Sequence, residues 1–111
     1  MLNRTVIAGR LGSNPELKHT QTETPVCSVN VAVQRDYKSK DGEREVDWIS
    51  VVAWRNTAEF LSKYFSKGDM VIVDGRLQTR EWTDDEGNRR RTTEVVAENV
   101  YFGDSKKGED K

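Results

Sequence analysis

Residues 49–73, ISVVAWRNTAEFLSKYFSKGDMVIV, place the one helical segment of the chain between two β-rich segments. From Asn56 to Lys67 the apolar residues recur at helical spacing and form a stripe, which consists of Phe60, Leu61, Tyr64 and Phe65. Asn56 is expected to cap the first turn, with Glu59 three residues later, and Gly68 to follow the last turn. We therefore predict a single amphipathic helix between two strands.

Outside this helix the apolar residues recur with a period of two, which is typical of strands with one buried face. Five strands are expected, at Leu2–Leu11, Cys27–Gln34, Trp48–Trp54, Met70–Trp82 and Arg89–Phe102. Turn-forming residues separate them, at positions 12–15, 41–42 and 84–88. The fourth strand has an aliphatic side, with Val71, Val73 and Leu77. Its other side is polar, with Arg76, Gln78, Arg80 and Trp82.

Three strands, a helix and two strands form the element order of an OB-fold, a partly open five-stranded Greek-key barrel. We therefore expect an all-β fold with one helix between strands three and four, placed over one mouth of the barrel. An SH3-like barrel lacks such a helix there, and a ferredoxin-like fold needs two. The barrel domain is expected over residues 1–102, and a disordered polar tail over residues 103–111.

Composition narrows the function classes. The 111 residues allow one small domain, and 18 basic against 19 acidic side chains give a net charge of −1, which indicates neither a nucleic acid nor a membrane as partner. The longest apolar runs have four residues, whereas a membrane span needs about 20. The single cysteine, Cys27, excludes an internal disulfide, fits a cytoplasmic location and is expected to be a small buried hydrophobe.

Nothing in the sequence indicates catalysis. One cysteine and one histidine, His19, cannot form the usual zinc ligand sets, and His19 is expected on a surface loop. No glycine pattern matches a phosphate-binding loop that opens a helix. We expect a protein without enzyme activity, metal or cofactor.

The placement of the aromatic residues is the informative feature. Trp48 and Trp54 lie six residues apart on one strand, on the side opposite the aliphatic face, and Trp82 lies on the polar side of its strand. Any one tryptophan in a small domain more often fills the core. Three on polar sides favour stacking on the bases of a single strand, at about 1–3 kcal/mol per ring. Tyr37 lies in the charged segment from Arg35 to Glu45.

The densest basic cluster is Arg89–Arg91. It could pair across the hairpin with acidic residues 84–86 for ~0–1 kcal/mol, or it could hold phosphates together with Arg76 and Arg80 on the other arm. The residues leave these two interpretations open.

Beyond these local patterns, much of the chain resembles the bacterial single-stranded DNA-binding protein family. The resemblance runs through residues 1–102 in order and is carried by Asn3–Gly12, Asn14–Glu16, Val46–Trp48, Val51–Trp54, Lys67–Gly68, Gly75–Arg80, Trp82–Asp84 and Thr92–Val96. It implies an OB-fold that assembles as a homotetramer and binds single-stranded DNA without sequence choice, protecting it during replication, repair or recombination.

The resemblance also implies site residues. The stacking aromatics of the family fall on Tyr37, Trp48, Trp54 and Trp82, and matching basic positions are Arg4, Lys67, Arg80 and Arg90. With Arg35 and Arg76, these four form the expected set of phosphate contacts. Glu81 stands where a lysine is often found, which weakens the positive charge of the hairpin.

One departure concerns partners. Relatives that recruit replication and repair enzymes end in an acidic tip with a terminal Pro-Phe, whereas residues 103–111 carry balanced charges and no apolar anchor. We expect no recruitment of tail-dependent partners. Two other classes stay open as alternatives: an OB-fold adaptor for proteins, which a titration with oligonucleotide would distinguish, and a small hydrolase, which lacks any acid–base arrangement.

Overall fold

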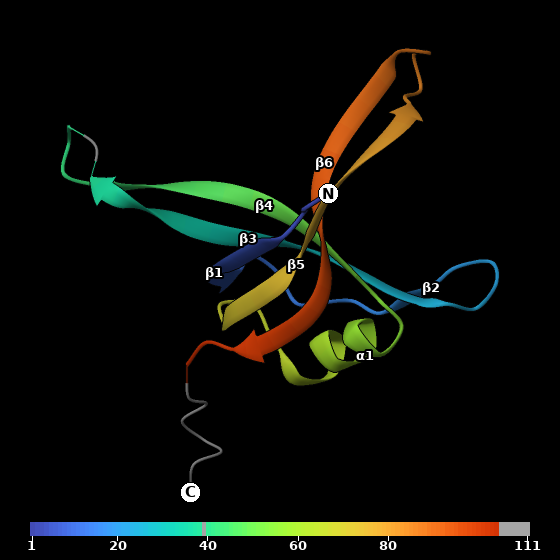
Figure 1. The fold of residues 1–111 in the computed structure, drawn as a ribbon, viewed down its shortest axis with the longest axis horizontal. Coiled ribbons are helices and arrows are strands. Elements are labelled where there is room, and N and C mark those ends of the chain that lie inside the picture. Colours follow the sequence, from blue (N-terminus) through green and yellow to red (C-terminus); the bar gives the residue numbers. More distant parts are fainter. Residues whose placement is uncertain (39, 105–111) are drawn as a thin grey trace, which may run out of the picture.

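The computed structural model describes residues 1–38 and 40–104 of the chain. Its elements, in chain order, are β1 Thr5–Leu11, β2 Lys18–His19, β3 Pro25–Lys38, β4 Arg44–Trp54, α1 Arg55–Tyr64, β5 Met70–Thr83 and β6 Arg89–Phe102 (Figure 1). The last strand has the bounds that the sequence predicted. Strands β3 and β4 are longer than expected because the charged residues on both sides of their turn continue the ladder as far as Lys38 and Arg44.

The strands follow one another in the sheet in the order β1-β5-β6-β4-β3-β2, and a further pairing of β1 with β3 closes the barrel. All pairs are antiparallel except β4 with β6. Closure requires a glycine: a Cβ atom at Gly9 would lie 2.3 Å from the carbonyl oxygen of Ala32. Five long strands with one helix between β4 and β5 confirm the predicted OB-fold. The two-residue β2 is an addition to it.

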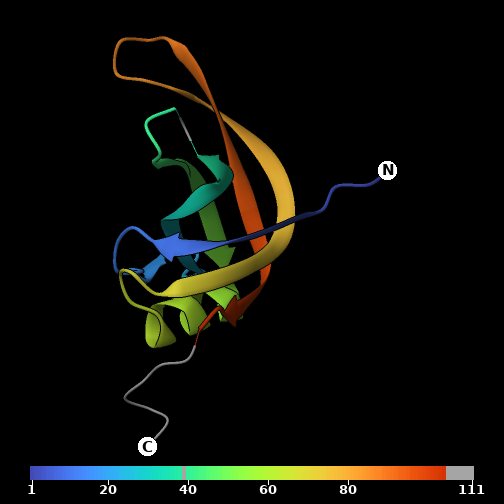
Figure 2. The same ribbon diagram turned by 90° about the vertical axis from the view of Figure 1, so that its left-hand side faces the viewer.

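Aliphatic side chains from all five long strands fill the barrel, together with residues of α1. The helix lies next to the barrel, below the β5–β6 hairpin in the view of Figure 1 and again in Figure 2. Val31, Val51, Val71 and Val95 are almost fully buried. Cys27 is buried among them, as predicted, and this burial raises the pKa of its thiol. The helix contributes Ala58 and Leu61, and Phe65 follows directly after it.

The predicted bounds and cap of the helix are wrong. The helix begins at Arg55 rather than Asn56, and its N-cap is Trp54, whose side chain makes no capping hydrogen bond. This follows because strand β4 runs straight into the helix, which leaves Asn56 inside the first turn. The helix ends at Tyr64 rather than Lys67, since Phe65 adopts an extended conformation and its ring stacks on that of Phe102, with centroids 4.5 Å apart.

The first strand also begins later than predicted, at Thr5. Before Thr5, the chain is bonded to β5 through the side chain of Asn3 and not through its backbone. The Asn3 Nδ2 donates to the carbonyl of Leu77 at 2.8 Å, and its Oδ1 accepts from the Leu77 N–H at 2.9 Å. After β6, the Gly103 N–H donates to the Met70 carbonyl at 3.0 Å. The tail expected over residues 103–111 lies outside the described residues from position 105 onward.

The hairpin of β5 and β6 projects beyond the barrel and bends over it (Figure 2). The register changes once, where Asp74 faces Asn99 and Gly75 faces Ala97, so Glu98 is an extra residue in β6. From Gly75 to Thr83 the pairing is regular. Leu77 keeps the side predicted for it, yet its side chain is 48% exposed because the strand has left the core at that point.

Candidate nucleic-acid interface

One face of the sheet, on the side away from the core, brings most of the predicted site residues together. Val52 of β4 pairs with Val96 of β6, and Val96 pairs with Arg76 of β5. Paired residues in a ladder share a face, and every second residue returns to it. The outer face, as we name it, therefore includes Val26, Ser28, Asn30, Ala32, Trp48, Ser50, Val52, Trp54, Arg76, Gln78, Arg80, Trp82, Arg90, Thr92, Glu94 and Val96.

The three tryptophans of the outer face are all accessible. Trp48 is 63%, Trp54 42% and Trp82 43% exposed. The alternative that tryptophans fill the core is therefore wrong for each of them. Rings of this size that remain exposed on a barrel offer flat surfaces on which bases can stack.

Two of the rings are held by neighbouring residues. The Trp82 Nε1–H donates to the Thr92 hydroxyl oxygen at 3.0 Å, across the hairpin. The Trp48 ring lies over Gly12, directly after β1, where a Cβ atom would be only 2.7 Å from Trp48 Cζ3. These contacts limit the orientations of both rings, which lowers the entropy cost of placing a base on them.

Trp54 is the last residue of β4 and lies at the junction with α1. Arg55, which follows it, has a φ of +56°, in the left-handed region that non-glycine residues rarely adopt. The Arg55 side chain is exposed and forms no ion pair within residues 1–38 and 40–104. Sequence reasoning missed this cation. The signal that could have found it is the Trp-Arg pair at the boundary between a strand and a helix.

Tyr37 lies near the end of β3, with its ring 63% exposed. Its hydroxyl oxygen accepts a hydrogen bond from Arg35 Nη1 at 3.4 Å. Arg35 is held in turn by both carboxylate oxygens of Asp47, at 2.9 and 3.1 Å, and by Glu45 at 2.9 Å. The hydrogen bond from Arg35 lowers the pKa of the Asp47 carboxyl. Arg35, a predicted phosphate contact, thus already has two acidic partners.

A hollow of about 200 Å³ separates the barrel part of the outer face from the hairpin part. Its lining includes Ser28, Asn30 and Ser50 on one side and Arg80 and Thr92 on the other. Small neutral side chains therefore line the barrel side, and the ion pair of Arg80 with Glu94 lines the hairpin side.

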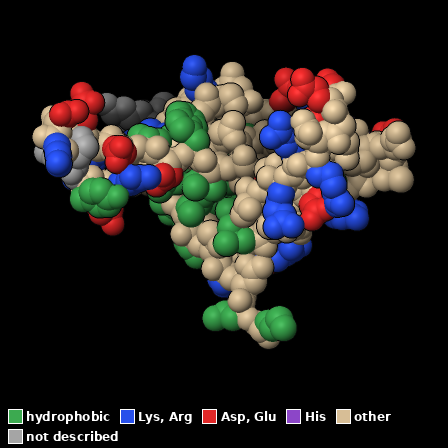
Figure 3. Space-filling model, turned by 90° about the horizontal axis from the view of Figure 1, so that it is seen from above, with side chains coloured by type: hydrophobic (Ala, Val, Ile, Leu, Met, Phe, Trp, Pro, Cys, Tyr) green, Lys and Arg blue, Asp and Glu red, His purple; other side chains and the backbone are tan. Residues whose placement is uncertain are grey.

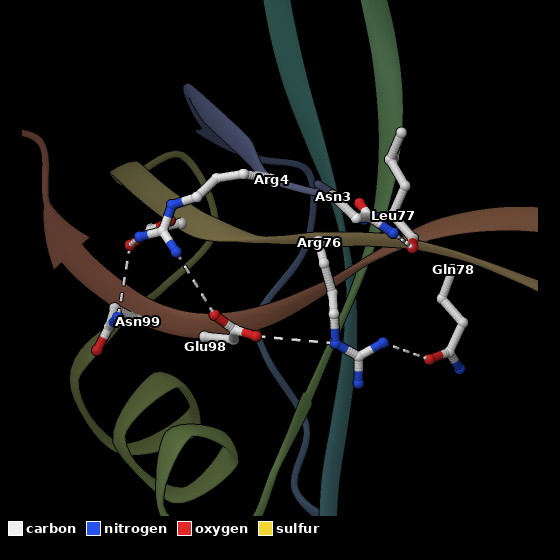
Figure 4. A network of polar contacts seen from close by, with 8 residues as sticks. Asn3, Arg4, Arg76, Leu77, Gln78, Glu98 and Asn99 are labelled. Carbon is white, nitrogen blue, oxygen red and sulfur yellow. Dashed lines mark hydrogen bonds and ion pairs between the residues drawn. The ribbon is translucent and has the colours of Figure 1, made fainter. Parts of the chain in front are cut away.

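Arg4 and Arg76 converge on one carboxylate. Glu98, the extra residue of β6, lies 3.9 Å from Arg4 Nη1 and 3.7 Å from Arg76 Nε (Figure 4). Arg4 also donates to Asp74 Oδ2 at 2.6 Å, and Arg76 donates to the side-chain oxygen of Gln78 at 2.8 Å. The bulge therefore places Arg4 beside the outer face, although Arg4 precedes β1 in the chain.

The remaining cations of the outer face are paired as well. Arg80 Nε lies 3.5 Å from Glu94, and Arg90 Nε donates to Asp84 Oδ2 at 2.9 Å. The other oxygen of Asp84 accepts the backbone N–H groups of Glu86 and Asn88. The Asn88 N–H and the Arg90 guanidinium lower the pKa of the Asp84 carboxyl.

Arg89 and Arg91 share one acidic partner, Glu81, on the adjacent strand. Pairing across the hairpin, one of the two interpretations of this cluster, is therefore present in the structure, although Glu81 and Asp84 supply the carboxylates. Lys67 differs from the other predicted contacts. It lies in the turn before β5, its N–H donates to Asn14 Oδ1 at 2.8 Å, and its ammonium group has no acidic partner among the described residues.

Other site types find no support in the described part of the chain. Residues 1–38 and 40–104 contain no group of three or more His, Cys, Asp or Glu side chains arranged to bind a metal. Over the same residues, no helix has the length and apolar character needed to cross a lipid bilayer.

Comparison with known proteins agrees with this geometry. The family model described as "Single-strand binding protein family" matches residues 2–103. Single-stranded DNA-binding protein 1 of Staphylococcus aureus strain MSSA476 is 46% identical over 110 residues, which cover 99% of this chain and 70% of that protein. The single-stranded DNA-binding protein of Caldanaerobacter subterraneus is 44% identical over 108 residues, 97% of this chain and 72% of the relative. The chain belongs to the single-strand binding protein family.

Proposed function

We propose that the chain binds single-stranded DNA without sequence specificity, by stacking bases on Tyr37, Trp48, Trp54 and Trp82 and by contacting phosphates with basic side chains. The observation that carries this proposal is the outer face, where three exposed tryptophans share one surface with Arg76, Arg80 and Arg90. Every base has a flat π surface, so stacking needs no particular sequence. The family to which the chain belongs supports the same ligand.

The phosphate contacts are the cations predicted above: Arg4, Arg35, Lys67, Arg76, Arg80 and Arg90. Five of these six are ion-paired, as described, and Lys67 is the exception among the described residues. Exposed ion pairs contribute only about 0–1 kcal/mol each, so a phosphate can replace a carboxylate at little cost. The expected result is binding that falls with salt, at about −0.7 in log affinity per log salt for each contact.

The test is quenching of intrinsic tryptophan fluorescence by oligo-dT and by a duplex of the same length. Stacking on three tryptophans should quench strongly with oligo-dT and little with duplex. Equal quenching by both, or none by oligo-dT, would overturn the proposal.

We further propose that the chain assembles as a homotetramer. Apolar side chains lie on the sheet surface formed by β1, β5 and β6: Ala8 pairs with Ile72, and Ile72 pairs with Tyr101. Tyr101 is 52% exposed, and Val6 beside them is also exposed. Burial of this surface against a second copy would remove apolar area from water. Light scattering at micromolar concentration should give four times the mass of the chain, and a monomer would contradict this assembly.

Such a protein would protect single strands during replication, repair and recombination, which is the general role of the family. A single-stranded DNA ligand and a lone buried cysteine fit a bacterial cytoplasm. The reaction class is binding alone, with no bond made or broken.

A further inference from the structure

The hairpin of β5 and β6 has a second face with a different chemistry. Trp82 pairs with Arg90 on the outer face, whereas Glu81 pairs with Arg91 and Thr83 with Arg89. Alternation along the strands therefore places a second set of residues on the opposite side of the hairpin. The reverse face, as we name it, consists of Thr79, Glu81, Thr83, Arg89, Arg91 and Thr93.

A single carboxylate holds both cations of the reverse face. Glu81 Oε2 accepts from Arg91 Nη2 at 3.2 Å, and Glu81 Oε1 contacts Arg89 Nη2 at short range. The two guanidinium groups remain accessible, with side chains 80% exposed for Arg89 and 69% for Arg91. Seen from above, the right-hand side of the molecule carries blue and red side chains next to one another (Figure 3). The cations are therefore reachable by a ligand but partly neutralised.

None of the six residues of the reverse face is aromatic, so this face cannot stack on bases. The rings of the hairpin and of β4 lie on the outer face. Arginines without a neighbouring ring contact the phosphate backbone, which single-stranded and duplex DNA share. Free arginines on this face would thus attract both forms of DNA, whereas stacking on the outer face requires unpaired bases. Any binding through the reverse face weakens discrimination between the two forms.

We propose that Glu81 is a specificity-determining residue: by partly neutralising Arg89 and Arg91, it weakens the binding of duplex DNA to the reverse face. Specificity is a difference between two affinities, and it is raised by weakening the unwanted complex as well as by strengthening the wanted one. The inference deepens the proposed function and rests on it. Asp84 acts on the other side of the hairpin, on Arg90, so the two acidic residues have separate targets.

The test compares Glu81→Gln with Glu86→Gln in the full chain. Both substitutions add one positive charge to the same hairpin, but the Glu86 side chain has no arginine partner among the described residues. Affinity for oligo-dT is measured by tryptophan quenching, and affinity for a labelled duplex of the same length by fluorescence anisotropy, over a range of salt concentrations.

We expect Glu81→Gln to raise duplex affinity several-fold at low salt and to steepen the duplex salt dependence by up to about 1.8, or about 0.9 for each freed arginine. Affinity for oligo-dT should rise less, because the outer face already holds the single strand. The ratio of oligo-dT affinity to duplex affinity should therefore fall. Adding Arg89→Gln and Arg91→Gln to Glu81→Gln should abolish the gain in duplex affinity.

Three results would overturn the role of Glu81: an affinity ratio that Glu81→Gln leaves unchanged or raises, an equal change with Glu86→Gln, or a gain that persists without the two arginines. Failure of the proposed function is distinguishable from these, since the unmodified chain would then show no quenching by oligo-dT.

Discussion

Strand β4 and the β5–β6 hairpin carry the same outer face but use different interactions. Strand β4 presents two tryptophans among small or neutral neighbours such as Ser50 and Val52. On this face the hairpin presents one tryptophan and three arginines, at positions 76, 80 and 90, and each of these arginines has an acidic partner. Binding at β4 should therefore depend on stacking alone, and binding at the hairpin on an exchange of carboxylates for phosphates.

The free energies of stacking and of ion pairing indicate which region contributes more to DNA affinity. A stacked base contributes about 1–3 kcal/mol, whereas an exposed ion pair contributes about 0–1 kcal/mol. Strand β4 should thus supply most of the affinity with little salt dependence. The hairpin should supply less affinity and most of the salt dependence. The following predictions test this division, starting from the largest expected effect.

Trp54→Ala should weaken oligo-dT binding by about 1–3 kcal/mol, or about 5- to 150-fold, because one stacking surface is lost. The salt dependence should not change, since no cation is removed. Trp54→Phe retains a flat ring and is the matched control, with most of the affinity preserved. A Trp54→Ala chain that bound as tightly as the control would show that β4 is not the stacking surface.

Gly12→Ala should weaken binding by less than the removal of a ring. The added methyl group would meet the Trp48 ring at 2.7 Å, so the ring must shift from its present position. Oligo-dT affinity measured by anisotropy should fall while the melting temperature changes little, because the ring is mostly exposed. Gly42→Ala has open space around the added Cβ and serves as the control for affinity, although its φ of +84° should lower the stability of that variant.

Arg55→Gly should stabilise the fold, because glycine adopts a φ of +56° without steric cost. Left-handed backbone at a non-glycine residue costs of order 1–3 kcal/mol, and the entropy of the unfolded glycine offsets part of the gain. Arg55→Ala removes the same cation but keeps the strain. If Arg55 contacts DNA beside Trp54, both variants should lose affinity equally while only Arg55→Gly gains stability in urea denaturation.

Asp84→Asn should have the smallest effect, and a defined pH dependence. The Asn88 N–H and Arg90 lower the pKa of Asp84 in the folded chain, so this carboxylate stabilises the fold above its unfolded pKa of about 3.9. That contribution is lost as pH falls through the lowered pKa. The variant should therefore melt below the parent at pH 7, and the gap should narrow as pH falls below about 4. A gap independent of pH would contradict this, and Asp85→Asn is the control.

Much of the fold could be predicted from the sequence because its signals are local. Alternation of valines fixed the core faces of β3, β4 and β5, and turn residues marked where the hairpins reverse. The helix cap could not be predicted in this way. Asn56 and Glu59 match a capping pattern, but β4 continues to Trp54 and Arg55 takes the left-handed backbone that starts the helix. That choice depends on how far β4 continues in the sheet, which the local pattern does not encode.

The site was predictable to a different extent. The side of the strand on which each tryptophan lies follows from counting along the sequence, so the three exposed rings were expected. The partners of the arginines were not, because they depend on register between strands that are distant in the sequence. Glu98 reaches both Arg4 and Arg76 only through the bulge beside Asp74. A one-residue shift would have produced other pairs.

The division of labour between β4 and the hairpin is tested most directly by the salt dependence of oligo-dT affinity in three chains: the parent, Trp54→Ala, and Arg80→Gln. We expect Trp54→Ala to shift the plot of log affinity against log salt downward without changing its slope. Arg80→Gln should make the slope shallower by about 0.7, with a smaller loss of affinity. Slopes that change equally in both variants, or a slope that changes only in Trp54→Ala, would contradict the assignment of stacking to β4 and phosphate contact to the hairpin.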